Sequence, residues 1–134
     1  MTPFSLKIVT PDGLKYDGPV EELIVRTTSG DMGILAGHVN CVAPLGMGQA
    51  LIVANGKRRV AACIGGMVSM VNGSATLVPT TFEWAEDIDA DRAAASEQRA
   101  KAVLSNKTAT DTDIRMAEAR LKRALIRKNV ASYK

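Results

Sequence analysis

An acidic and a basic residue, Asp89 and Arg92, stand three residues apart where the sequence turns helical. Residues at this spacing share one helix face, so the carboxylate and the guanidinium can meet one ligand. Backbone N–H groups at a helix start also attract anions. A nucleotide fits this combination, with Asp89 accepting from a base amino group or sugar hydroxyl and Arg92 pairing with phosphate. A plain helix start with an acidic cap and an exposed arginine is the simpler interpretation.

The positive charge of the chain is concentrated near its end. Residues 111–134 hold seven Lys/Arg and three Asp/Glu, whereas the whole chain has a formal net charge of only +3. Arg120, Arg123 and Arg127 lie on one stripe of the helix expected there. If this helix lies back along the preceding one, Arg123 and Arg127 are predicted to complete a phosphate pocket. The alternative is a solvated basic face.

Neither a catalytic site nor a metal site is predicted. His38 is the single histidine, expected as a turn residue hydrogen-bonded to backbone. Cys41 and Cys63 lie in separate apolar stretches without a C-x-x-C spacing, which is typical of buried, reduced thiols. The sequence has no G-x-x-x-x-G-K-[ST] or G-x-S-x-G motif. An enzyme is therefore the least expected class, for want of a nucleophile and its base.

Short strands are predicted over residues 1–84. Phe4, Leu6 and Ile8 alternate with polar residues, which is the period of a half-buried strand. Asn-Gly pairs at Asn55-Gly56 and Asn72-Gly73 separate apolar runs and predict two hairpins. The pattern indicates an antiparallel β-sandwich or flattened barrel of eight to ten strands.

Two helices are predicted over residues 85–134. Asp87 or Asp89 caps a first helix that runs to about Leu104, and Asp111 or Thr112 starts a second that runs to about Val130. A short polar connection between them predicts an antiparallel hairpin. Because its apolar positions are mostly alanine, this hairpin is expected to dock weakly and to be separable. The fold class is thus an antiparallel β domain, a sandwich or a flattened barrel (1–84), followed by a two-helix domain (85–134).

The order and spacing of five segments resemble the epsilon-subunit family of bacterial F-type ATP synthases over essentially the whole chain. These segments are Val9-Thr10-Pro11-Asp12-Gly13, Gly33-Ile34-Leu35-Ala36-Gly37-His38, Ile64-Gly65-Gly66-Met67-Val68, Ala85-Glu86-Asp87-Ile88-Asp89 and Leu121-Lys122-Arg123-Ala124. Ala36 and Asn40 stand where the family often has proline. The stretch from Ile88 to Ala93 also matches the I-D-x-x-R-A pattern of relatives that bind ATP.

The resemblance implies a ten-stranded sandwich and a helical hairpin in a non-catalytic rotor subunit. Its partners would be the gamma subunit and the c ring, and the alpha and beta catalytic subunits when the arm extends. The subunit would couple ion flow to ATP synthesis and restrain ATP hydrolysis. No cofactor is required, and ATP is the regulatory ligand. The implied ATP-binding residues are Glu83, Ile88, Asp89, Arg92, Ala93, Arg123 and Arg127.

Two other functions stay open on the residues alone. One is a free-standing nucleotide-sensing module, and the other is a basic-helix module that binds nucleic acid. The modest net charge and the lack of basic residues interleaved with aromatics argue against nucleic acid. No secretion leader and no membrane-spanning run is recognised, so any membrane association is expected through a partner. The resemblance implies a peripheral place within the ATP synthase complex, at the cytoplasmic face of the cell membrane.

Overall fold

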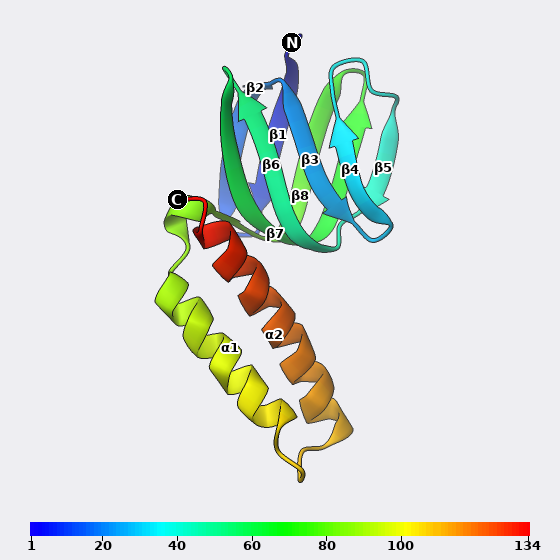
Figure 1. The fold of residues 1–134 in the computed structure, drawn as a ribbon. Coiled ribbons are helices and arrows are strands. Elements are labelled where there is room, and N and C mark those ends of the chain that lie inside the picture. Colours follow the sequence, from blue (N-terminus) through cyan, green and yellow to red (C-terminus); the bar gives the residue numbers. More distant parts are fainter. The chain divides into compact units, whose positions relative to one another are not determined.

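The computed structural model describes residues 1–134 and divides them into two compact units, Met1–Trp84 and Ala85–Lys134 (Figure 1). The first unit consists of eight strands and the second of a short 3-10 turn and two helices, which confirms the predicted fold class. The strands are β1 (Phe4–Thr10), β2 (Gly13–Val20), β3 (Glu22–Thr27), β4 (Gly30–Ile34), β5 (Cys41–Pro44), β6 (Met47–Ala54), β7 (Lys57–Val71) and β8 (Ser74–Trp84). The helical elements are η1 (Ala85–Asp87), α1 (Ala90–Leu104) and α2 (Asp111–Ala131).

Hydrogen bonds join the strands in the order β2-β1-β8-β7-β6-β3-β4, with β5 paired to β7. Every pair is antiparallel except β1 and β8, which run parallel from Ser5 opposite Ser74 to Ile8 opposite Leu77. The prediction that all strands pair antiparallel is therefore wrong for this one pair. The two strands are far apart in the sequence, so no turn fixes their direction.

Strand β7 explains why eight strands build a sandwich for which ten were expected. Its first part, up to Ile64, pairs with β6, and its last part, from Met67, pairs with β5. Gly65 and Gly66 lie between these parts with φ of 69° and 98°. Positive φ is accessible to glycine at little cost, so the strand bends there and contributes to both layers. Strand β8 follows β7 along both parts.

The core of the sandwich is mainly aliphatic, in a chain with only 4% aromatic residues. Phe4, Leu6 and Ile8 on β1 are buried, and the residues between them are more exposed. The buried side chains of all the longer strands join one cluster, which includes Phe82 and Trp84. Phe82 packs edge-on against Trp84 with ring centroids 4.9 Å apart.

Both Asn-Gly pairs form the predicted hairpin turns. Asn55 and Gly56 join β6 to β7 with φ of 53° and 73°, and Asn72 and Gly73 join β7 to β8 with φ of 49° and 82°. Positive φ at both central residues suits the right-handed twist of the paired strands. These turns therefore fix the register of β6 with β7 and of β7 with β8.

In the helical unit, α1 and α2 form the predicted antiparallel hairpin (Figure 1). Asp89 is the N-cap of α1. Thr110 is the N-cap of α2 and forms a capping box with Asp113, which satisfies two N–H groups of the helix start. On α2, Ala117 and Ala124 are buried whereas the larger Leu125 is exposed.

Candidate functional site

The start of α1 carries the I-D-x-x-R-A segment. The Oδ1 of Asp89 accepts a hydrogen bond from the backbone N–H of Arg92 at 3.0 Å, so the predicted acidic cap is confirmed. Ile88 and Ala93 are buried, at 2% and 4% exposure, whereas Asp89 and Arg92 are exposed. The two apolar residues of the segment therefore pack, and the two charged residues are exposed to solvent.

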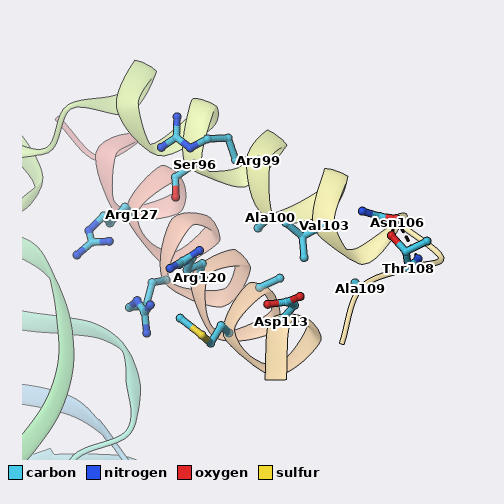
Figure 2. Close-up of a pocket in the computed structure, with 13 residues that line it drawn as sticks. Ser96, Arg99, Ala100, Val103, Asn106, Thr108, Ala109, Asp113, Arg120 and Arg127 are labelled. Carbon is cyan, nitrogen blue, oxygen red and sulfur yellow. Dashed lines mark hydrogen bonds between the residues drawn. The ribbon is translucent and has the colours of Figure 1, made fainter. Parts of the chain in front are cut away.

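A groove of about 850 Å³ runs between α1 and α2 (Figure 2). Helix α1 contributes one wall, helix α2 the other, and the connecting loop closes one end. The lining residues are Ser96, Arg99, Ala100, Val103, Asn106, Thr108, Ala109, Asp113, Met116, Ala117, Arg120, Arg123 and Arg127.

Four arginines give the groove a strongly positive character. Arg120, Arg123 and Arg127 come from α2, at the spacing that keeps residues on one helix face, and Arg99 comes from α1. Arg99, Arg120 and Arg123 have no acidic partner within the chain. Asp113 is the acid of the lining, and its Oδ2 accepts a hydrogen bond from the backbone N–H of Thr110 at 3.2 Å. Guanidinium groups that lack an acidic partner are free to bind an anion. The groove is therefore suited to a polyanion such as a nucleotide phosphate chain.

Arg92 lies on the α1 face that leads into this groove. Arg92, Ser96, Arg99 and Val103 are separated by four, three and four residues, so they share one side of the helix. The last three line the groove, and Arg92 stands one turn nearer the helix start. The capped end of α1 and the basic groove thus belong to one continuous helix surface.

The residues expected to bind nucleotide divide into three groups. Arg123 and Arg127 line the groove, as predicted for a phosphate pocket. Ile88, Asp89, Arg92 and Ala93 lie at the start of α1, outside the groove lining. Glu83 belongs to β8 of the first unit, opposite Ala62. Binding of ATP by this set stays a prediction.

Two groove arginines were not assigned to the site from the sequence. Arg99 follows Arg92 by seven residues, a spacing that would have placed it on the same face. Arg120 was recognised only as part of the basic stripe. Helical spacing alone could have added both residues, but only the packed hairpin brings them to one groove.

His38 and the two cysteines are the other residues whose surroundings the sequence predicts. The ring Nδ1 of His38 lies 2.9 Å from the carbonyl oxygen of Val39, as predicted for a turn histidine bonded to backbone. Cys63 is buried, but Cys41 is only partly buried, which corrects the expectation for that thiol. Its strand, β5, is short and pairs only with β7.

The chain holds neither a metal-binding cluster nor a helix that could span a membrane. No group of three or more His, Cys, Asp or Glu side chains is arranged to hold a metal ion. Neither α1 nor α2 combines the length and the apolar character required to cross a bilayer.

A β-sandwich followed by a helical hairpin with a basic groove defines a two-domain architecture. The family model described as the ATP synthase delta/epsilon chain beta-sandwich domain matches residues 3–85. The model of the long alpha-helix domain of the same chain matches residues 86–132. The chain therefore belongs to the ATP synthase delta/epsilon chain family.

Relatives of nearly the same length carry the name ATP synthase epsilon chain. The protein of Bacillus velezensis is 44% identical and that of Bacillus pumilus 41% identical, each over 98% of both chains. The protein of Ruminococcus albus is 38% identical over the full length of both chains. These identities place the chain with the epsilon chains of ATP synthase.

Solved structures of ATP synthases share the fold. A chain of the Euglena gracilis mitochondrial ATP synthase, solved as an OSCP/F1/c-ring assembly, aligns with a TM-score of 0.84 at 22% identity, covering 100% of this chain and 83% of that one. A chain of the Tetrahymena thermophila central stalk and c-ring aligns with a TM-score of 0.65 at 13% identity over 95% of both chains.

Proposed function

We propose that this chain is a non-catalytic subunit of the ATP synthase rotor that links gamma to the c ring. Its family and its fold support this role, since the matched relatives are epsilon chains of ATP synthase. It would couple ion transport to ATP synthesis without performing chemistry itself. Its place would be peripheral, at the cytoplasmic face of the cell membrane, and its attachment would come through the complex.

The sandwich offers a surface for the rotor partners. Val42, Met67, Val71 and Val78 are exposed apolar side chains on neighbouring strands β5, β7 and β8. Met67 lies directly opposite Val78 in the β7–β8 pair, and Val42 lies on β5 beside the same part of β7. Adjacent exposed apolar residues favour protein contacts. We assign this surface to the gamma and c-ring contacts.

ATP is the proposed regulatory ligand of the helical unit. The single observation that carries this proposal is the basic groove, in which three arginines lack acidic partners and Arg127 is a further lining residue. The three are Arg99, Arg120 and Arg123. The phosphates would bind these guanidinium groups, and the base and sugar would be held by Asp89 and its neighbours at the start of α1. Because the groove needs both helices, ATP would bind only the folded hairpin.

Because ATP would bind only the folded hairpin, the ATP concentration would set the fraction of hairpins that are folded. A ligand at a hundredfold excess over its Kd stabilises the state that binds it by about 2.7 kcal/mol. When ATP is scarce, the hairpin would open and extend toward the alpha and beta subunits, where it would inhibit ATP hydrolysis. Residues 111–134 carry a net charge of +4, which would favour contact with an acidic surface of the alpha and beta subunits. Salt would weaken this contact.

Two measurements test the proposal. Calorimetric titration of the full chain with Mg-free ATP is expected to give saturable binding at one site. ATP hydrolysis by a synthase complex depleted of its own epsilon chain is expected to fall when this chain is added, and most at low ATP. ATP binding without any effect on the complex would favour a free-standing nucleotide sensor, and the absence of binding would leave only the rotor role.

A further inference from the structure

The two helices of the hairpin meet along a line of small residues. Ala93 and Ala100 on α1 are buried, as are Ala117, Ala124 and Ala131 on α2. In each helix these alanines are seven residues apart, the repeat of helices that pack along one side. We call these five residues the alanine seam. Alanines bury little apolar area, so the seam alone holds the helices together weakly.

An ion pair between a buried carboxylate and a half-exposed lysine interrupts the seam. Glu97 lies between Ala93 and Ala100 and is only 5% exposed. Its Oε1 accepts a hydrogen bond from the Nζ of Lys128 at 2.6 Å. Lys128 lies between Ala124 and Ala131, which is the equivalent position on α2. The two charged residues therefore face each other across the hairpin.

A second lysine completes the environment of this carboxylate. The Nζ of Lys101, one turn along α1, lies 3.1 Å from Oε2 of Glu97. The hydrogen bond from Lys128, followed in size by that from Lys101, lowers the pKa of Glu97 below its ordinary value, so this carboxylate is ionised at neutral pH. No buried side-chain oxygen or nitrogen of the chain lacks a hydrogen-bond partner, and each carboxylate oxygen of Glu97 has a lysine partner in the closed hairpin.

We propose that Glu97 and Lys128 form an interhelical latch that holds α1 against α2 and sets how readily the hairpin opens without nucleotide. The latch rests on the proposed function, in which the hairpin moves. Neither residue lines the arginine groove. The latch and a bound nucleotide would therefore both stabilise the closed hairpin, but from different sites.

The three charges explain how the latch can hold α1 against α2 and still allow the helices to separate. Lys128 is the partner on the other helix, so only its contact breaks when the helices separate. Lys101 belongs to the same helix as Glu97 and stays beside the carboxylate in the opened form. Opening also returns both freed groups to water, which limits its cost. Removal of Lys128 leaves the buried carboxylate of Glu97 with Lys101 alone, so it is expected to weaken closure at least as much as removal of both partners.

Hydrogen exchange of the full chain without nucleotide tests the latch. Glu97→Gln and Lys128→Met, which keeps the apolar stem, are each expected to speed exchange across α1 and α2 by about tenfold, the lower end of the range for a hydrogen bond to a charged group. The double variant is expected to exchange no faster than either single variant. Lys101→Met is the matched control, with a smaller effect, and the strands are the internal reference.

The outcomes separate the latch from the nucleotide site. Unchanged exchange in both single variants, or strictly additive effects in the double variant, would overturn the latch. If the single variants lose helicity, a charge-reversed triple variant replaces them: Glu97→Lys, Lys101→Glu and Lys128→Glu. This variant is expected to exchange as slowly as the unaltered chain, and fast exchange in its helices would also overturn the latch. ATP added to Glu97→Gln is expected to restore protection. Fast exchange that ATP does not slow would leave the latch standing and remove the nucleotide proposal.

Discussion

The carboxylate of Asp89 accepts a hydrogen bond from the backbone N–H of Arg92 at 3.0 Å, which ties the two charged residues of the I-D-x-x-R-A segment to one helix start. The bond uses Oδ1 of Asp89. An ionised carboxylate has further lone pairs on its second oxygen, so the same residue can cap α1 and still accept a hydrogen bond from a ligand. The two roles of Asp89 can therefore be tested separately.

Replacement of Asp89 is expected to separate helix capping from nucleotide binding. Asp89→Ala removes the cap, and we expect it to destabilise the helical unit by about 1 kcal/mol. Asp89→Ser keeps a capping oxygen but has no carboxylate, so it is expected to retain helicity and to lose ATP affinity. Circular dichroism during thermal unfolding and calorimetric titration measure the two effects. Equal ATP affinity in Asp89→Ser and the unaltered chain would assign Asp89 to capping alone.

The groove arginines are expected to bind phosphate. Arg123→Gln removes a guanidinium that has no acidic partner in the chain, and should weaken ATP binding by about 10- to 100-fold, the range for hydrogen bonds to charged groups. Arg115→Gln is the matched control, because Arg115 is an exposed arginine of α2 outside the groove lining. Similar losses in both variants would indicate a general charge effect rather than a site.

Gly66 is expected to be essential to the bend of β7. A Cβ atom there would overlap the carbonyl oxygen of Val78 and lie 2.7 Å from Cα of Pro79, both backbone atoms of β8. Gly73→Ala is the control, since Gly73 also has positive φ but a Cβ added there would meet no atom within 4 Å. We expect Gly73→Ala to cost about 1 kcal/mol and Gly66→Ala several times more. Urea unfolding followed through Trp84 fluorescence compares them.

Burial raises the pKa of the Cys63 thiol to about 12. The folded chain therefore keeps this thiol neutral at pH values where the unfolded chain ionises it. Its contribution to stability is complete below pH 9.0, the ordinary value, and is lost as the pH rises toward 12. At pH 11, about two units above the unfolded value, the loss should be about 2–3 kcal/mol.

Comparison with Cys63→Ala isolates this effect from the other groups that titrate at high pH. The unaltered chain should lose more stability between pH 8 and pH 11 than the variant, as measured by urea unfolding. Thiol labelling gives an independent check. Iodoacetamide at pH 8 should modify the partly exposed Cys41 and spare Cys63 in the folded chain. Equal labelling of the two thiols would contradict the burial of Cys63.

The sequence by itself determined the local elements. The alternation at Phe4, Leu6 and Ile8 predicted β1 and its buried face, and the Asn55-Gly56 and Asn72-Gly73 pairs predicted two hairpins. The acidic cap at Asp89 predicted the start of α1. Each of these depends on the conformational preferences of a few consecutive residues, so the information is present in a short stretch of sequence.

Only the tertiary structure decided which distant residues meet. The parallel pairing of β1 with β8, the addition of Arg99 and Arg120 to the groove, and the burial of Glu97 against Lys128 were not predicted. Periodicity assigns a residue to a face of its own helix or strand, but not to the element that packs against that face. Those partners are set by close packing of the whole domain, in which contacts far apart in sequence must be satisfied together.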